Sequence, residues 1–300
     1  MEPDYNFLKN TLIANPIDYK KIKEDNIVIT YVPEEKYDIN FIIPVRGRVS
    51  FLKPMYNAFK KAAENSELKI SLTVSEHSFN PEHSHFCKQN KINYIWIKAE
   101  EKQPFNKCLA MNMGAIYSPQ TNNFLFHDLD CLIQSDFFIK LLENIKNKEC
   151  KAIQCFHGRR VLYLNDELTN KVIAEQIDID TFKLGMAGIN LPYAIGAPGG
   201  SIFVDKNLFF EVGGYDPELF YSNAPEDVFF WDKIDEVSKM EISDNPEIDL
   251  FHMNHPVTYH DNPKINDMLF LSRSFKVAKP EQKREFVNLK KEALKEFYYE

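Results

Sequence analysis

Hydrophobic residues gather in short runs from residue 39 onward, and polar or amphipathic stretches separate these runs. Short runs rich in β-branched and aromatic residues predict buried strands, whereas apolar residues at helical spacing predict helices. The predicted strands cover residues 39–45, 68–74, 92–97, 124–126 and 152–156, with a further strand after residue 200. The predicted helices cover residues 50–63, 106–117, 135–150 and 206–212, with Ser50 and Ser135 as N-caps. Alternating strands and helices are typical of a mostly parallel sheet, so the sequence predicts an α/β fold.

The two ends of the chain and one internal segment depart from this pattern. Residues 1–37 mix charge with scattered apolar residues, although 27–32 predict a strand. Within the segment 158–194, residues 166–182 predict a polar helix that covers the site. Residues 280–300 predict an amphipathic, charged helix. We therefore predict an accessory segment at 1–37, a main domain at 38–278 and a C-terminal helix at 279–300.

Composition narrows the class of protein. The chain is 44% hydrophobic and contains 24 Phe, which is ample for a sizeable core. A net charge of -8 argues against a nucleic-acid partner. The 5 cysteines are odd in number and form no Cys-x-x-Cys pair, which favours reduced thiols in the cytoplasm. No apolar run reaches the roughly 18 residues of a membrane span, so we expect a cytoplasmic protein without one.

Two carboxylates follow the predicted strand at 124–126. Asp128 and Asp130 are one residue apart, so in an extended backbone their side chains share a face. Two convergent carboxylates at a strand end form an oxygen-rich site for Mg²⁺ or Mn²⁺, usually shared with phosphate oxygens. The alternative is a polar turn after a core strand.

Arg46 and Arg48 follow the predicted strand at 39–45 and should emerge on the same edge of the sheet. Guanidinium groups match phosphate oxygens, so this pair can hold a diphosphate. The alternative is a solvated turn. The sequence contains neither of the glycine-rich phosphate loops of dehydrogenases and P-loop enzymes, which argues against both of those classes.

A second set of candidates lies in the last third of the chain. Gly199 and Gly200 precede a strand and would let the backbone approach a ligand closely. Glu226 and Asp227 fall in the first turn of a predicted helix, after Pro225. They are either ordinary helix-start acids or a general base with a sugar-binding partner.

Two imidazoles, His252 and His255, stand three residues apart after a predicted strand and are candidate metal ligands. His83 and His85 form a rival cluster that we assign to the surface, because the loop around them offers no carboxylate partner. His260 is a weaker alternative ligand.

Taken in order, these stretches resemble the GT-A glycosyltransferases, specifically the inverting enzymes related to the β-1,4-galactosyltransferase and chondroitin polymerase groups. The resemblance runs from about Ile39 to His255 and leaves out the amino-terminal segment, residues 158–194 and the tail. The motifs that carry it are residues 42–48, 105–114, 126–130, 199–201, 213–215 and 226–227, and the pair His252 and His255.

The resemblance implies a Rossmann-like nucleotide-binding half and a mixed central sheet flanked by helices. It also implies roles for particular residues. The metal ligands would be Asp130, His252 and His255. The donor nucleotide would contact Pro44, Arg46, Arg48, Phe105, Lys107, Asp128, Leu129, Asp130, Gly199 and Gly200. Asp227 would be the catalytic base, and Glu226 would hold the acceptor.

Three departures from the family pattern bear on specificity. His252 stands where the galactosyltransferases have a methionine, which changes the metal's ligand set. Ala197 replaces a bulky aromatic residue beside the donor's 2-position and leaves room for an N-acetyl group. Residues 223–225 stand where the family has a mobile tryptophan, so the family's mode of acceptor recognition does not carry over to this chain.

The sequence therefore predicts a metal-dependent inverting glycosyltransferase. It would use Mn²⁺ or Mg²⁺ to move a hexose or N-acetylhexosamine from a UDP-sugar to a hydroxyl of a glycan acceptor. The alternatives are a catalytically inactive module that binds sugar nucleotides or glycans, and a nucleotidyltransferase. The particular UDP-sugar, the acceptor, the linkage and the oligomeric state stay open.

Overall fold

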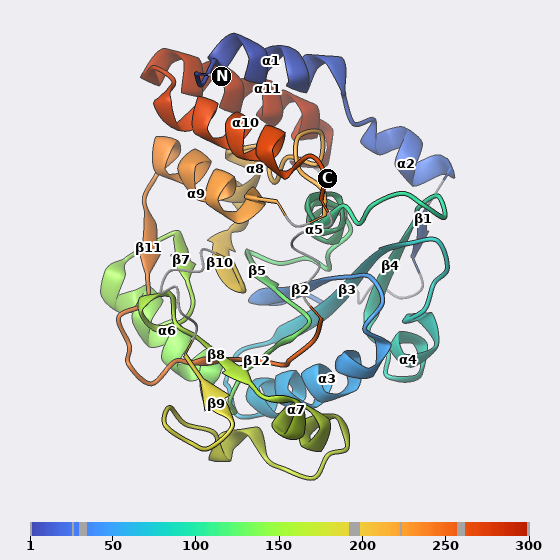
Figure 1. Ribbon diagram of the computed structural model, residues 1–300, viewed down its shortest axis with the longest axis vertical. Coiled ribbons are helices and arrows are strands. Elements are labelled where there is room, and N and C mark those ends of the chain that lie inside the picture. The colour runs from blue at the N-terminus through green and yellow to red at the C-terminus, as the bar shows by residue number, and fades with distance from the viewer. Residues whose placement is uncertain are drawn as a thin grey trace.

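The computed structural model describes residues 2–25, 27–29, 35–191, 199–222, 224–256 and 262–298 (Figure 1). Its centre is an eight-stranded sheet with the strand order β1-β4-β3-β2-β5-β10-β7-β11. These strands are β1 (Ile27–Ile29), β2 (Ile39–Val45), β3 (Ile70–Ser78), β4 (Asn93–Lys98), β5 (Asn123–His127), β7 (Ala152–Gln154), β10 (Ser201–Asp205) and β11 (Met240–Ile242).

The direction of β10 decides what lies beside the end of β5. Strands β4, β3, β2 and β5 run parallel, but β10 runs antiparallel between β5 and β7. Ser201, the first residue of β10, therefore pairs with His127, the last residue of β5. The Gly199–Gly200 pair is thus brought next to the carboxylates that follow β5. The predicted mixed sheet is confirmed.

A smaller sheet has the order β6-β12-β8-β9. Its strands are β6 (Cys131–Leu132), β12 (Leu250–His252), β8 (Val161–Leu164) and β9 (Ile189–Asn190). Strand β6 begins directly after Asp130 and pairs antiparallel with β12, so that Cys131 lies opposite His252. This pairing joins two parts of the sequence that are far apart along the chain.

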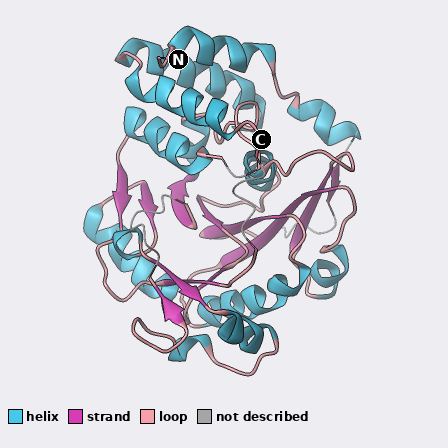
Figure 2. Cartoon of the chain, viewed as in Figure 1, coloured by secondary structure: helices cyan, strands magenta, loops and turns pink. Residues whose placement is uncertain are grey.

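Helices cover both faces of the central sheet (Figure 2). Above it in the view of Figure 1 lie α1 (Tyr5–Ala14), α5 (Lys107–Ile116), α8 (Lys206–Glu211), α9 (Glu226–Val237), α10 (Ile265–Val277) and α11 (Pro280–Tyr298). Below it lie α3 (Val49–Glu64), α4 (Ser84–Gln89), α6 (Phe137–Lys148) and α7 (Asp166–Ile173). The remaining helical elements are α2 (Tyr19–Asp25) and the 3-10 turns η1 (His157–Arg159) and η2 (Ile179–Thr181).

Each face of the sheet carries its own hydrophobic core, because successive side chains of a strand point to opposite faces. On β5, Phe124 and Phe126 join the core of the upper helices, whereas Leu125 joins the core of the lower helices. On β2, Ile42 faces the upper core and Phe41 the lower one. This double burial explains why these strands are continuous hydrophobic runs.

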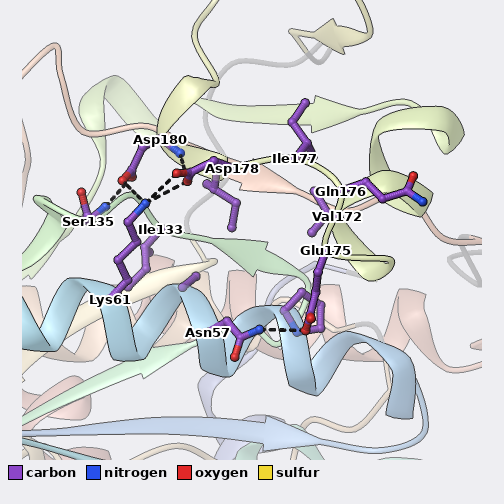
Figure 3. A pocket seen from close by; sticks show the side chains of 13 residues that line it. Asn57, Lys61, Ile133, Ser135, Val172, Glu175, Gln176, Ile177, Asp178 and Asp180 are labelled. Atoms are coloured by element: carbon purple, nitrogen blue, oxygen red, sulfur yellow. Dashed lines mark hydrogen bonds and ion pairs between the residues drawn. The ribbon is translucent and has the colours of Figure 1, made fainter.

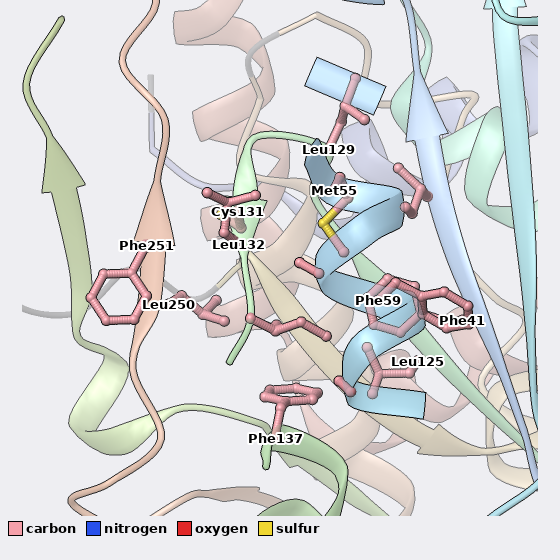
Figure 4. Packing of buried hydrophobic residues seen from close by; sticks show 14 of the residues in the cluster. Phe41, Met55, Phe59, Leu125, Leu129, Cys131, Leu132, Phe137, Leu250 and Phe251 are labelled. Carbon is pink, nitrogen blue, oxygen red and sulfur yellow. The ribbon is translucent and has the colours of Figure 1, made fainter. Parts of the chain in front are cut away.

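The loop after β5 is anchored in the lower core (Figure 4). Leu129 and Cys131, which flank Asp130, are both buried in it. Two buried neighbours restrict where the Asp130 side chain can point. The same cluster contains Met55 and Phe59 of α3, Phe137 of α6, and Leu250 and Phe251 of β12.

Several predicted boundaries are wrong. Helix α3 begins at Val49 with Arg48, not Ser50, at the N-cap position, because the Phe51 N–H already bonds the Arg48 carbonyl. Asp136, not Ser135, precedes α6, and the Ser135 N–H donates to the Asp180 carboxylate at 2.8 Å.

The predicted helix at 166–182 is also too long. Helix α7 ends at Ile173, because Glu175 adopts a left-handed backbone (φ 57°) that cannot continue the helix. The predicted second strand is displaced and runs from Ile70 to Ser78. Of the strand predicted at 27–32, residues 30–32 lie outside the described residues.

The two ends of the chain pack together in the upper layer. The Tyr5 hydroxyl donates to Glu285 of α11 at 2.8 Å, and the Asp4 N–H donates to Ser274 of α10 at 2.9 Å. The division into three parts stays a prediction. Among the described residues, no helix combines the length and hydrophobicity needed to cross a membrane.

Candidate active site

Asp130, His252 and His255 meet at the junction of β6 and β12. The Asp130 Oδ2 atom lies 3.0 Å from His255 Nε2 and 3.7 Å from His252 Nε2. One ligand atom from each residue falls within 4.8 Å of the others, so the three can hold one metal ion. We call these residues the metal cluster. They are the set that the family resemblance implied as metal ligands. Asp128, expected to converge with Asp130 on one metal, instead pairs with Lys107.

The Asp130 carboxyl is held ionised despite its burial. Burial alone would raise its pKa, but the hydrogen bond with His255 and the charges of His252 and Arg48 outweigh burial and hold the pKa well below its usual range. An ionised carboxylate with two imidazoles suits Mn²⁺ better than Mg²⁺, which prefers oxygen ligands alone. The residues present therefore fit the predicted manganese.

The two predicted phosphate-binding arginines point to different places. Arg48 forms an ion pair with Asp130 Oδ2. Arg46 instead donates from Nη1 to the Gln103 carbonyl at 2.5 Å.

Two other predicted nucleotide contacts lie on neighbouring elements. Pro44 is buried in β2. Phe105 is half-buried and stacks on His77, with the ring centroids 6.3 Å apart. Four residues near the end of β2 and before α5 were predicted to contact the nucleotide: Pro44, Arg46, Arg48 and Phe105. Of these, Arg48 is the one whose described contacts reach the metal cluster.

A second group of charges lies on the other side of the loop after β5. The Lys107 Nζ atom, at the start of α5, is 2.9 Å from Asp128, 3.2 Å from Glu226 and 3.3 Å from Asp227. We call these four residues the acid cluster. The two acids occupy the first turn of α9, as the sequence predicted. Lys107, predicted as a phosphate contact, is here the shared counter-ion of three carboxylates.

One ammonium group cannot neutralise three carboxylates. Burial raises the pKa of Glu226 to about 8, with Lys107 opposing the shift and the Asp227 charge adding to it. Burial also raises the pKa of Asp227. The Asp128 charge adds to this rise, whereas Lys107 opposes it. A carboxylate with a raised pKa is a stronger base near neutral pH. The arrangement suits proton abstraction.

The double glycine serves the acid cluster directly. A Cβ atom at Gly199 would lie 2.0 Å from Asp227 Oδ2, so only glycine allows this carboxylate to rest against the segment that leads into β10. Gly200 has a φ of 94°, which a side chain would strain, and its carbonyl accepts the Asp128 N–H at 3.0 Å. Both glycines therefore fix acidic residues of the site.

A small cavity of about 10 Å³ lies between Lys107, Asp128, Gly200, Tyr215 and Asp227. A much larger cavity, of about 360 Å³, lies between α3 and residues 172–180 (Figure 3). None of the described residues that line the larger cavity belongs to either cluster, so we place the site at the smaller one. Ion pairs across the larger cavity join Lys61 to Asp178 and Asp180 at 2.8 and 2.6 Å.

One histidine was wrongly assigned to the surface. His83, assigned to the surface, is buried with Nδ1 3.1 Å from Glu76 Oε2, and Tyr94 donates to the same oxygen at 2.6 Å. The assignment was wrong because the carboxylate partner comes from β3, outside the loop. His85 is exposed, as expected. His260, Ala197 and Asn223 lie outside the described residues.

Comparison with known proteins identifies the class. Residues 45–263 match the model of the family described as "Glycosyltransferase like family 2", so the chain belongs to this family. No curated protein sequence matches the chain.

Solved structures of glycosyltransferases share the fold. A mannosyltransferase from Pyrobaculum calidifontis, in complex with GDP-Man and Mn²⁺, is 12% identical, with 97% of this chain and 80% of that chain covered and a TM-score of 0.53. GalNAc-T7 with UDP, GalNAc and Mn²⁺ is 15% identical, with 87% and 55% covered and a TM-score of 0.50. A Drosophila β-1,4-galactosyltransferase 7 mutant with manganese, UDP-Gal and xylobiose is 13% identical, with 75% and 74% covered and a TM-score of 0.47. Two predictions are thereby confirmed: the protein has the GT-A fold, and it is a glycosyltransferase.

Proposed function

We propose that this enzyme is a metal-dependent inverting glycosyltransferase that moves a hexose or N-acetylhexosamine from a UDP-sugar to a glycan hydroxyl. The observation that carries the proposal is the arrangement of the two clusters around one loop. Asp130 belongs to the metal cluster and Asp128 to the acid cluster, and only Leu129 separates them in the chain. The site for the leaving diphosphate and the residue that accepts the proton would thus lie side by side.

The metal cluster would hold the cation beside the donor diphosphate. When bound, Mn²⁺ supplies positive charge that stabilises the diphosphate as the glycosidic bond breaks. Asp130 supplies the anionic ligand, because its lowered pKa keeps it ionised across the physiological range. Arg48, already at this carboxylate, would contact the phosphates.

Asp227 would accept the proton of the acceptor hydroxyl. Its raised pKa and its fixed position against Gly199 suit a general base. Attack on the face of the sugar opposite the diphosphate would invert the anomeric configuration. Glu226, in the same helical turn, would bind the acceptor.

The nucleobase is the least constrained part of the proposal. Among the structural neighbours, GalNAc-T7 was solved with UDP and the P. calidifontis enzyme with GDP-Man. We favour UDP because the sequence motifs resemble those of UDP-sugar enzymes. GDP-mannose is the second candidate donor, supported by the neighbour whose match covers 97% of this chain.

The family match favours glycosyl transfer over the nucleotidyltransferase alternative. An inactive binding module would not need a base of raised pKa fitted against a glycine. The test is release of nucleoside diphosphate from a panel of UDP-sugars and GDP-mannose, with Mn²⁺ and without acceptor. Release from one UDP-sugar supports the proposal, whereas tight binding without any release supports the inactive module. The anomeric configuration of the product, read by NMR, tests inversion.

A further inference from the structure

The turn between β2 and α3 has an unusual backbone. Gly47 and Arg48 are both left-handed, with φ of 61° and 52°. This conformation suits glycine but is disfavoured for a residue with a Cβ, such as Arg48. Arg48 also occupies the N-cap position of α3 without any side-chain cap bond.

The Arg48 side chain forms an ion pair with the metal cluster. Arg48 Nη1 binds Asp130 Oδ2, the oxygen that also faces both imidazoles. The other oxygen, Oδ1, faces the Cys131 thiol at 3.8 Å. The guanidinium therefore lies on the one carboxylate oxygen toward which the candidate metal ligands converge.

The two partners differ in their access to solvent. The Arg48 side chain is 41% exposed, whereas the Asp130 side chain is 8% exposed. A buried carboxylate needs a nearby cation, but an exposed guanidinium can return to water at little cost. The pair can thus be broken by movement of Arg48 alone.

We propose that Arg48 is an internal counter-ion of Asp130 that a divalent cation displaces, which frees the guanidinium for the donor diphosphate. This inference rests on the proposed function, since it requires that the metal cluster binds a cation. In this exchange the single positive charge of Arg48 leaves the Asp130 carboxylate, and the two positive charges of the cation take its place. The diphosphate then receives both the cation and the released arginine. Metal and nucleotide binding are coupled, and each tightens the other.

The proposal predicts opposite effects of one substitution on two ligands. Without nucleotide, Arg48→Met should bind Mn²⁺ about 5- to 10-fold more tightly than the wild type, because the competing cation of a partly exposed ion pair is gone. With Mn²⁺ saturating, the same variant should bind UDP more weakly. A purely structural role for Arg48 predicts no gain in Mn²⁺ affinity.

The experiment is calorimetric titration of the full chain with Mn²⁺ alone, then with UDP at saturating Mn²⁺. Arg46→Met is the matched control, because Arg46 is two residues away and bonds a backbone carbonyl instead; its Mn²⁺ affinity should equal that of the wild type. Arg48→Gly is a second variant whose backbone suits the left-handed turn, so it keeps the test open if Arg48→Met folds poorly.

Unchanged or weaker Mn²⁺ binding by both Arg48 variants would overturn the inference while leaving the proposed function intact. Failure of the wild type to bind Mn²⁺ at all would overturn the metal cluster and the inference with it. Asp130→Ala, which should lose Mn²⁺ binding, identifies the site of the titrated ion.

Discussion

The metal cluster and the acid cluster flank the same loop, yet their buried carboxylates behave in opposite ways. The pKa of Asp130 is lowered, while those of Glu226 and Asp227 are raised. Burial acts in the same direction on all three. The difference lies in the partners: Asp130 faces Arg48 and two imidazoles, whereas Lys107 is shared by three carboxylates. Burial raises the pKa in both clusters and is outweighed only at Asp130, where the hydrogen bond with His255 and the nearby charges act on a single carboxylate.

This contrast suggests a different task for each cluster. A carboxylate that stays ionised can bind a cation, and a carboxylate of raised pKa can take up a proton. Removing one component of either cluster should therefore impair one task and spare the other.

Asp227→Asn should lower turnover by about 10²–10⁴-fold, because a general base contributes rate by that order. Mn²⁺ and UDP binding should remain, since the metal cluster is untouched. Initial rates and UDP titration check both expectations. Asp232→Asn, farther along α9, is the control and should retain activity. Wild-type turnover in Asp227→Asn would move the base elsewhere.

Gly199→Ala should lower turnover by up to about 10²-fold, because a displacement of the base by about 1 Å can have that effect. The added Cβ would lie 2.0 Å from Asp227 Oδ2, so the carboxylate must move. Kinetics and Mn²⁺ titration together distinguish a displaced Asp227 from general misfolding. If only Asp227 moves, the Mn²⁺ affinity should stay at the wild-type value. Unaltered kinetics would show that the position of Asp227 is not critical.

His255→Ala should weaken Mn²⁺ binding by at least about tenfold, because even residues that only orient a metal ligand contribute that much. Calorimetric titration measures it. His85→Ala, at an exposed histidine, should leave the affinity unchanged. Equal affinities for both variants would remove His255 from the ligand set.

The pH dependence of stability should distinguish the clusters. The pKa of Glu226 is raised from 4.5 to about 8, so its contribution to the unfolding free energy is complete below 4.5 and is lost as the pH rises toward 8. The wild type should therefore lose stability relative to Glu226→Gln between those values, by at most about 1.4 kcal/mol per pH unit.

Denaturant unfolding of both proteins at several pH values checks this expectation. A difference that stays constant across the range would contradict the raised pKa. The pH dependence from Asp130 has the opposite sign. Because its pKa is lowered, Asp130 stabilises the folded state above pH 3.8, and this contribution is lost as the pH falls below that value.

Much of the fold was predictable from local patterns. The buried strands β2 and β5, the helix at α5 and the acids at the start of α9 all follow from hydrophobic runs and helix-start chemistry. The residues of the metal cluster were implied by the family resemblance. The strand-end pattern alone placed Asp128 beside Asp130 in one metal site, which was wrong because Asp128 pairs with Lys107. The roles of the metal cluster in binding stay predictions.

The contacts between distant segments were not predictable. Arg48 pairs with a residue 82 positions away, and Lys107 with one 120 positions away. Arg48 and Asp130 follow the neighbouring parallel strands β2 and β5, so their nearness was expected but their ion pair was not. The position of Asp227 depends on the antiparallel strand β10, because Asp227 rests against Gly199, and no local pattern predicts that insertion. The error at His83 has a different cause, because its partner Glu76 is only 7 residues away but lies in β3 instead of the loop around the histidine.

The most direct test of the account is thermal unfolding with UDP, with and without Mn²⁺, of the wild type, Asp130→Ala and Asp227→Asn. A ligand that binds the folded state stabilises it by about 2.7 kcal/mol at a hundred times its dissociation constant. We predict a Mn²⁺-dependent shift with UDP in the wild type and in Asp227→Asn, and none in Asp130→Ala. An equal shift in all three proteins would contradict the separation of the site into a metal-binding and a proton-accepting cluster.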